Sequence, residues 1–431
     1  MFSLCRRLNH FFWFFILIIC VVADAQSCDP GYEEKTLGYT IFVFNKCFIQ
    51  TINYGESGVS DSVGSPFTHL AGSKTLCFID ADGSDGVGTS AIFGRISSAV
   101  LIQNSAKLIV ADRSAHKLRT VDCETGEVKT ILYAQYAQND YAHNALDIDG
   151  VGTSAGISYP NTLTFSTNPT GVYVSNNYNM RKVTYPGIEV STVDFQNYIV
   201  DYRKYQSISR DGTFMIMTNE LLGQVIKYNL TSNTRSILTT GRLSINSVYV
   251  CSDGKSNIAR YANPRYSVIN SIGTVVYISD SYNNLNIRKL VLATEMVSSL
   301  VGICPENNRQ NSHNVQGMVL SPDESQLIFI ECNNIVDYTG PKQCTLNRVN
   351  VITGVVNVIN PSSGPSYDFS NVYNLVLKPR ERGPCMLCEQ GTYSLSGSKC
   401  NICPVGFFCG ITSLLQCPAG KCTRYCKFYN T

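Results

Sequence analysis

The chain has 431 residues and a formal net charge of +2, and only 15% of its residues are charged. This balance argues against nucleic acid and anionic membranes as partners, because both require a concentrated basic face. The length exceeds that of one ordinary domain, although a closed array of repeats can use it as a single body.

The first 25 residues predict a secretory signal peptide. Arg6 and Arg7 form a basic start, and residues 11–22 (FFWFFILIICVV) form an apolar run that is too short to span a bilayer. The small-x-small pattern that ends at Ala25 predicts cleavage before Gln26. An uncleaved signal anchor is the alternative, which the short run disfavours. No later segment predicts a transmembrane helix, so we expect a secreted, extracellular protein.

An internal repeat dominates the part of the chain that follows. The seven residues DGVGTSA occur at 85–91 and again at 149–155, 64 positions apart. About twenty residues after each copy comes a strand-like run, then a polar turn and a basic pair, in residues 107–121 and 171–185. Identity at a fixed spacing of this kind is the mark of a repeat architecture.

Six strand-like runs, each followed by two further strand-like segments, divide the chain into six units. In chain order these runs are 40–45, 108–112, 172–176, 214–219, 275–280 and 327–331. With the apolar run that follows each DG loop, the unit is a four-stranded antiparallel meander. One meander cannot bury both of its faces, but six arranged radially can. The sequence therefore predicts an all-β, six-bladed β-propeller that extends over residues 26–379.

The two ends of this region predict how the ring closes. The chain enters at the second strand of a blade, 40–45, and leaves with a lone first strand, 371–379. Together they complete one blade, so the propeller is closed by its own termini and leaves no open sheet edge.

The order of motifs resembles the NHL-repeat family of propellers. The residues that carry the resemblance are Leu70-Ala71-Gly72, DGVGTSA, LIVAD and HKLRTV, and in the fifth unit DGKSNIARYANP, VVYISD and NIRKL. The resemblance covers about residues 40–379 and implies a propeller fold. The WD40 and kelch patterns fit less well, because the only Trp is Trp13 in the signal segment.

Residue types that could support catalysis or bind a metal are sparse. After the signal, the His residues are scattered: His69, His116, His143 and His313. We expect His116 to be a turn residue, although some NHL-type propellers are lyases that use several His and a metal. The acidic run 80–86 resembles a calcium loop, but Ala91 stands where the bidentate Glu is required, and Asp147 with Asp149 gives a thinner version. An Asp-Gly turn between blades is the favoured interpretation, so no catalytic residue, metal or cofactor is predicted.

The sequence also predicts where the basic residues of the strands and a glycosylation site lie. The basic residues in the second and third strands are expected to be blade-face residues that form no binding patch: Lys117, Arg119, Arg181, Lys182, Arg288 and Lys289. Asn229-Leu230-Thr231 is a glycosylation sequon just before a turn, whereas Asn360 is excluded because Pro361 follows it.

Cysteine usage supports an oxidising compartment. Of the 18 cysteines, Cys5 and Cys20 belong to the signal segment, which leaves 16, an even number typical of disulfides. Cys332 and Cys344 face each other across a predicted hairpin and should be bonded. Weaker expectations are Cys251–Cys304, in equivalent loops of successive blades, and by remainder Cys47–Cys77 and Cys28–Cys123.

The C-terminal residues 380–431 predict a small cysteine-rich module. The pattern CxxCxxGTYS…CxxCPxGxxC…CPAG resembles the ephrin-receptor-like cysteine repeat. We expect its eight cysteines to be disulfide-bonded, in pairs that the sequence leaves open: Cys385, Cys388, Cys400, Cys403, Cys409, Cys417, Cys422 and Cys426. A zinc ribbon built on the two CxxC pairs is the alternative, which the signal peptide disfavours.

These features favour a secreted, non-catalytic interaction or adhesion protein. The propeller would present one face to an extracellular protein or glycan. Two alternatives remain open: an extracellular hydrolase or lyase that uses the central channel, and a structural subunit of a cell-surface coat or appendage.

Overall fold

A computed structural model shows the architecture of the protein. The structure describes residues 39–379, except 55–66, 77–82, 103–105, 137–144, 168–169, 177–178, 194–203, 240, 242, 246–247, 281–284, 303–311, 335–342 and 360–371, and also the short strands 32–33, 386–387, 392–393, 401–402, 407–410 and 413–416. The predicted signal segment, with Ala25 and Gln26, lies outside the described residues.

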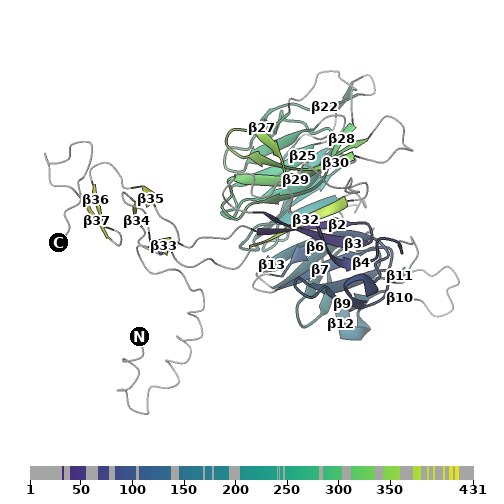
Figure 1. The fold of residues 1–431 in the computed structure, drawn as a ribbon. Helices are drawn as coiled ribbons and strands as arrows, with labels where there is room; N and C mark the ends of the chain where they lie inside the picture. The colour runs from purple at the N-terminus through teal and green to yellow at the C-terminus, as the bar shows by residue number, and fades with distance from the viewer. Residues whose placement is uncertain are drawn as a thin grey trace, which may run out of the picture. The chain divides into compact units, whose positions relative to one another are not determined.

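Six antiparallel sheets form the six blades, each written here from the inner to the outer strand (Figure 1). Blade one contains β32 (Val372–Pro379), β2 (Tyr39–Asn45), β3 (Phe48–Tyr54) and β4 (Thr68–Gly72). Blade two contains β6 (Ile96–Leu101), β7 (Lys107–Asp112), β8 (Lys117–Asp122), β9 (Glu127–Tyr133) and β5 (Gly86–Val87). Blade three contains β13 (Thr162–Thr167), β14 (Thr170–Ser175), β15 (Met180–Thr184), β16 (Glu189–Val193) and β12 (Gly150–Val151).

The remaining blades follow the same order. Blade four contains β17 (Lys204–Ile208), β18 (Phe214–Asn219), β19 (Gln224–Asn229) and β20 (Thr234–Ile237). Blade five contains β24 (Pro264–Ile269), β25 (Val275–Asp280), β26 (Ile287–Val291), β27 (Met296–Val301) and β23 (Gly254–Lys255). Blade six contains β28 (Ser312–Leu320), β29 (Gln326–Asn334), β30 (Gln343–Asn350) and β31 (Val356–Val358). The six-bladed propeller predicted from the sequence is therefore confirmed.

The ring closes as predicted, with its last strand beside its first. β32 is the inner strand of blade one and is hydrogen-bonded to β2, although more than 320 residues separate them in the chain (Figure 1). Leu375, Val376 and Leu377 of β32 are buried, and they contribute to the clusters on both sides of the blade.

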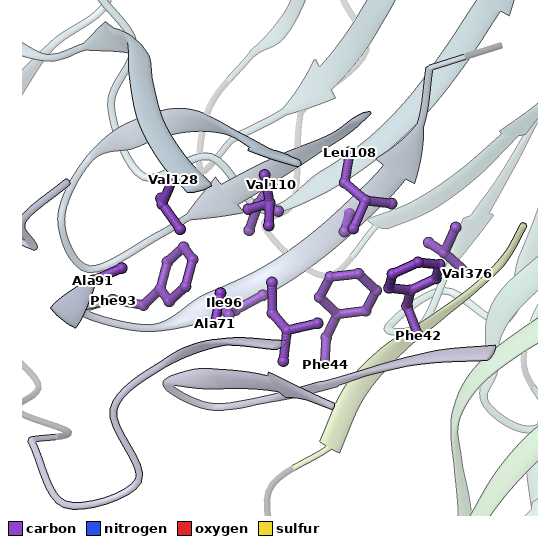
Figure 2. Packing of buried hydrophobic residues seen from close by; sticks show 13 residues of the cluster. Phe42, Phe44, Ala71, Ala91, Phe93, Ile96, Leu108, Val110, Val128 and Val376 are labelled. Carbon is purple, nitrogen blue, oxygen red and sulfur yellow. The ribbon is translucent and has the colours of Figure 1, made fainter. Parts of the chain in front are cut away.

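The core is divided into six clusters, one between each pair of neighbouring blades. The cluster between blades one and two joins Phe42 and Phe44 of β2 to Leu108 of β7, and Phe93 lies close to Val128 (Figure 2). Equivalent clusters follow around the ring and return to blade one. Because the second strand of each blade packs on both faces, it is buried along nearly its whole length and contains a continuous apolar run instead of an alternating pattern. The runs that revealed the repeat are these strands.

The DGVGTSA segments cross from one blade to the next. In each copy the Gly-Val pair after the Asp forms a short fifth strand, β5 or β12, on the outer edge of the following blade, and a 3-10 turn follows, η1 (Gly88–Ser90) or η2 (Gly152–Ser154). Gly88 and Gly152 have φ values of +57° and +59°, which favour glycine. The predicted connection between blades is observed at both copies, but its turn lies at Gly88–Ser90 and Gly152–Ser154 instead of at the Asp-Gly pair. β23 occupies the position of β5 and β12 in blade five.

Three of the basic residues that were predicted to be blade-face residues are buried beneath the segments that cross between blades. Arg119, Arg181 and Arg288 are buried, with relative exposures of 0%, 2% and 0%. Each guanidinium reaches the Asp of its DG segment: Arg119 to Asp85 at 2.8 Å, Arg181 to Asp149 at 2.6 Å and Arg288 to Asp253 at 2.5 Å. The sequence pattern places these residues on a strand but not under the crossing segment that covers them.

The disulfides agree in part with the sequence. Cys332 and Cys344 are bonded across the β29–β30 pair, with their Cα atoms 4.0 Å apart, as predicted. Cys47 and Cys251 are also disulfide-bonded. The partners predicted for them, Cys77 and Cys304, lie outside the described residues.

The predicted disulfide of Cys123 is wrong, because the thiol of this residue is free. It follows β8, and its backbone N–H donates to the carbonyl of Ala106 at 2.7 Å. Burial raises the pKa of this thiol to about 11, so it stays protonated at neutral pH. The pairing with Cys28 rested on elimination alone and had no geometric support; Cys28 itself lies outside the described residues.

Residues 39–378 form one compact unit, and residues 1–38 with 379–431 form a second. In the second unit β1 (Tyr32–Glu33) pairs with β33 (Met386–Leu387), so this N-terminal strand groups with the cysteine-rich segment. Two further hairpins follow, β34 (Thr392–Tyr393) with β35 (Asn401–Ile402) and β36 (Phe407–Gly410) with β37 (Ser413–Gln416). The side chains of the eight predicted disulfide cysteines in this unit lie outside the description. Within the described residues, no helix has the length and apolar character needed to cross a membrane.

Candidate functional site

A cavity of about 610 Å³ lies among the inner strands of all six blades. Residues of β6, β13, β17, β24, β28 and β32 line it. Each of these strands is the first of its blade when counted from the centre, so the cavity is the central channel of the propeller. No single blade contains the site, because the closed ring creates it.

Hydrogen bonds between blades hold the channel wall. The Nδ2 atom of Asn374 donates to Ser98 Oγ at 3.2 Å and to the carbonyl of Ala99 at 3.0 Å, which joins β32 to β6. Leu163 N–H donates to the same Ser98 Oγ at 3.0 Å, which joins β6 to β13. Gln206 and Ser207 continue the chain of contacts, to Thr162 and Ser267 respectively. Hydrogen bonds between neighbouring inner strands of this kind rigidify the wall.

One end of the channel is rich in arginine and tyrosine. These residues, which we call the channel mouth, come from the starts of inner strands and from neighbouring loops of blades two to five: Arg95, Arg113, His116, Tyr159, Tyr205, Arg265 and Tyr266.

Positive charge is concentrated at the channel mouth. Burial lowers the pKa of Arg113, and the nearby Arg95 lowers it further, whereas Tyr159 and Tyr205 oppose the shift. Arg265 is compensated by Glu220, whose carboxylate is 2.8 Å from its guanidinium. Glu220 does not line the cavity, and the described lining residues include three Arg and no Asp or Glu.

Two aromatic contacts shape the mouth. The rings of Tyr205 and Tyr266 lie with centroids 4.5 Å apart. Tyr159 is 39% exposed and meets His116 edge to face, at 3.9 Å between centroids. Tyr159 N–H donates to His116 Nδ1 at 3.2 Å, so this ring nitrogen carries no proton.

His116 and Tyr159 both adopt left-handed backbone conformations, with φ values of +53° and +41°. His116 lies in the turn between β7 and β8, as the sequence predicted. Burial lowers its pKa, Arg113 lowers it further, and Asp147 opposes the shift. Non-glycine residues in this conformation are uncommon, and two in contact mark a region where tertiary structure overrides local preference.

The other predicted site residues are placed separately. Asp85 and Asp149 anchor DG segments, each accepting from the N–H and the hydroxyl of a threonine, Thr130 or Thr192. Among the described residues, no group of three His, Cys, Asp or Glu is arranged to hold a metal ion. The acidic positions 80–82 and His143 lie outside the described residues.

Asn229 ends β19, directly before the turn to the outer strand β20. Its Oδ1 accepts from the N–H groups of Thr231 and Ser232, both at 2.9 Å. The residue is half-buried, and residues 231–237 that follow are exposed. The predicted position before a turn between outer strands is therefore correct, whereas the side chain, expected to be exposed, is half-buried.

The channel mouth was missed by the sequence reasoning. A signal for it exists: the tenth residue after the DG aspartate is Arg95 after Asp85 and Tyr159 after Asp149. The two repeats thus place different residues, Arg95 and Tyr159, at the same structural position. Positions that differ between otherwise identical repeats are candidates for functional residues.

Comparisons with known proteins support the fold alone. No family model matches the chain, and no curated protein matches its sequence. A chain in the crystal structure of a nidogen/laminin complex is similar in structure, with a TM-score of 0.50 and 8% identity, covering 79% of this chain and 98% of that one. TolB from Acinetobacter baumannii gives a TM-score of 0.46 and 11% identity, covering 80% and 67%.

Proposed function

We propose that the protein is a secreted, non-catalytic interaction protein whose propeller binds an extracellular protein or glycan through the channel mouth. The propeller is of the NHL type in this proposal, and residues 380–431 form an ephrin-receptor-like module. The observation that carries the proposal is the cluster of Arg and Tyr side chains at one end of a rigid ring.

The composition of the mouth suits molecular recognition. Arg and Tyr are enriched among the residues that dominate binding energy, because they combine contact area with directional hydrogen bonds. Tyr159 is exposed, and it interacts electrostatically with Arg113 across the blade boundary. The inter-blade hydrogen bonds fix the inner strands before binding, which lowers the entropic cost of association.

A similar fold in a nidogen/laminin complex shows that this architecture occurs in a protein–protein assembly. The disulfides support the extracellular part of the proposal, because they persist in oxidising compartments. Four of the five cysteines described within the propeller are disulfide-bonded: Cys47, Cys251, Cys332 and Cys344.

The proposal is tested by cross-linking mass spectrometry with the purified protein added to the surface of the source cells. We expect cross-linked partners to map to the channel mouth and to be lost in the Arg113→Glu, Tyr159→Ser double variant. Lys255→Gln, an exposed change on the outer edge of blade five, is the matched control. Partners that cross-link equally to both variants, or turnover in a broad hydrolase and lyase screen, would contradict the proposal.

Passage through the secretory pathway has its own test at Asn229. Protein secreted from a glycosylating host should carry a glycan there, and Asn229→Gln should remove the mass increment. The Thr231→Ala variant, which destroys the sequon but keeps Asn229, is the control and should lose the same mass. An unmodified Asn229 in the secreted wild type would contradict the prediction.

A further inference from the structure

In two of the blades a carboxylate holds the loop that leads into the inner strand. The tenth residue after the DG aspartate is Arg95 in blade two and Asn263 in blade five. The N–H of Arg95 donates to Asp112 at 2.9 Å, and the N–H of Asn263 donates to Asp280 at 2.6 Å. Each of these acceptors ends the second strand of its blade and also contacts the buried arginine of the third strand. The two loops are therefore fixed in the same way.

In blade three an imidazole from the neighbouring blade replaces this carboxylate. Asn176 directly follows the second strand, where the other two blades have an aspartate. Tyr159, at the position equivalent to Arg95, donates its N–H to His116 Nδ1 at 3.2 Å. His116 lies in the turn between β7 and β8 of blade two, so the hydrogen bond crosses the blade boundary. The same position of the loop is thus held by an acceptor that is lost when it binds a proton.

The backbone of Tyr159 also differs from that of its equivalents. Tyr159 has a φ value of +41°, whereas neither Arg95 nor Asn263 adopts the left-handed conformation. Its ring meets the ring of His116 edge to face, with the centroids 3.9 Å apart. A non-glycine residue stays in the left-handed region where surrounding contacts impose it. The contact with His116 is what sets Tyr159 apart, so its loss removes a restraint from a strained backbone.

Charged groups of both blades act on the His116 ring. Burial lowers the pKa of His116, Arg113 of the same turn lowers it further, and Asp147 of blade three opposes the shift. Asp147 also accepts from the N–H of Ser158 at 2.8 Å, so it lies beside the same loop. The ring is therefore neutral at neutral pH and binds a proton only below about 6.5, the ordinary pKa of His. A protonated ring is attracted to Asp147 and cannot accept from Tyr159.

We infer that His116 and Tyr159 form a pH-sensitive switch, which holds Tyr159 at the channel mouth at neutral pH and releases it on acidification. In the protonated form Nδ1 of His116 carries a proton, so the hydrogen bond breaks and the Tyr159 backbone relaxes. Arg95 and Asn263 keep their acceptors, because a carboxyl group offers an acceptor oxygen in either protonation state. The switch is a property of the fold, and only its effect on a bound partner, release at acidic pH, rests on the proposed function.

The test is amide hydrogen exchange of the purified full chain from about pH 7.5 to about pH 4.5, a range that includes the ordinary pKa of His. Fragmentation resolves single residues, and each rate is compared with the intrinsic rate at the same pH to give a protection factor. The protection factor of Tyr159 should fall about tenfold across this range, the effect of one lost hydrogen bond. Those of Arg95 and Asn263 should not change. No partner is present, so the result does not depend on whether the mouth binds one.

Two variants assign the change to His116. His116→Asn should keep Tyr159 protected throughout, because the amide oxygen accepts without titrating and asparagine tolerates the left-handed backbone. Arg113→Gln should move the loss of protection to higher pH, since it removes a positive charge that disfavours the protonated ring. Circular dichroism at neutral pH checks that both variants are folded.

Several outcomes would overturn the inference. Protection of Tyr159 that is absent at neutral pH, or unchanged on acidification, would show that the hydrogen bond does not act as a switch. A parallel loss at Arg95 and Asn263 would indicate a general effect of acid on the loops, and a loss that persists in His116→Asn would place the titrating group elsewhere. Because the three amides are compared within one molecule, the wild type alone decides the outcome if a variant does not fold.

Discussion

Buried arginine–aspartate contacts are the recurring feature of this molecule at the scale of single residues. The Arg119 guanidinium contacts Asp85 at 2.8 Å and Asp112 at 3.2 Å, and Asp112 also accepts from the N–H groups of Gly94 and Arg95. Arg288 repeats the arrangement with Asp253 and Asp280. A buried ion pair contributes little net free energy by comparison with an apolar replacement, but breaking one partner is costly. Each group of one Arg and two Asp side chains therefore fixes how a strand, a loop and a crossing segment pack together.

Arg119→Met should lower the free energy of unfolding by about 3–5 kcal/mol, because Asp112 would remain buried without its cation. Denaturant unfolding measures the loss. The double variant Arg119→Met, Asp112→Asn should recover part of it, since no unpaired charge stays buried and the amide oxygen still accepts one of the two N–H groups. Lys129→Met, on an exposed side chain of the same blade, should change stability by no more than about 0.5 kcal/mol. An Arg119→Met loss as small as that of the control would contradict the proposed role.

His116 predicts a pH dependence whose sign follows from its lowered pKa. Burial and Arg113 disfavour the charged imidazole of His116 in the folded state. At a pH below about 6.5, the ordinary pKa of His, the unfolded chain therefore binds more protons at this residue than the folded chain does. Stability contributed by neutral His116 is complete above that pH and is lost as the pH falls toward the folded-state pKa.

The comparison variant is His116→Asn, because asparagine tolerates the left-handed backbone at this position. Between pH 7 and pH 5 the wild type should lose more stability than the variant, measured as the shift in denaturation midpoint at each pH. Identical pH profiles would show that His116 does not titrate with folding.

At the scale of elements, the DG segment is the unit that joins blades. Asp85 accepts from Thr130 N–H at 2.9 Å and from Thr130 Oγ at 2.8 Å, which ties β5 to the outer strand β9. Blade three repeats this with Asp149 and Thr192, and blade five does so with Asp253 and Ser299. A serine or threonine at the same position of the outer strand completes the anchor in all three blades.

Asp85→Ala should release this segment while leaving the ring closed. We expect amide hydrogen exchange to accelerate over residues 84–92, and global stability to fall by about 1–3 kcal/mol for the lost charge-assisted bonds. Asp253→Ala should produce the same local effect over residues 252–260, because its contacts are equivalent. A global loss without local acceleration at either site would mean that the aspartates do not anchor the segments.

The elements were predictable because their signals are local. The second strands are apolar along their length, so 214–219 and 275–280 were predicted with the bounds that β18 and β25 have. The burial of Arg119 was not predictable from its own strand, because it depends on a contact with Asp85, which lies 34 residues earlier in the chain. The assignment of Cys123 to a disulfide failed for a related reason: even cysteine counts carry no information about geometry.

At the scale of the whole molecule, closure creates both the core and the candidate site. Arg95, Arg113, Tyr205 and Arg265 come from three blades, and only the ring brings them to one mouth. The six repeated units in the sequence predicted a closed six-bladed ring, but they could not predict which side chains face the channel. That depends on register at the inner strands, such as the shift between Pro264 and Ser267 in β24.

Truncation before β32 tests closure directly. A chain that ends at residue 370 leaves β2 as an unpaired edge and removes Leu375, Val376 and Leu377 from two clusters. At about 1.5–3 kcal/mol for each buried side chain, the loss is on the order of 5–9 kcal/mol, which is comparable to the total stability of many domains. We expect a large fall in melting temperature or failure to fold.

The control for this truncation ends at residue 379, so it retains β32 and lacks only the cysteine-rich segment. It should melt close to the parent, because residues 39–378 form their own compact unit. A synthetic peptide of residues 371–379 added to the shorter chain should restore part of the melting temperature, since the vacant inner edge of β2 would pair with it. Equal melting of the two truncated chains would show that β32 is dispensable. A shorter chain that folds but does not respond to the peptide would show that closure by the last strand is not what holds blade one together.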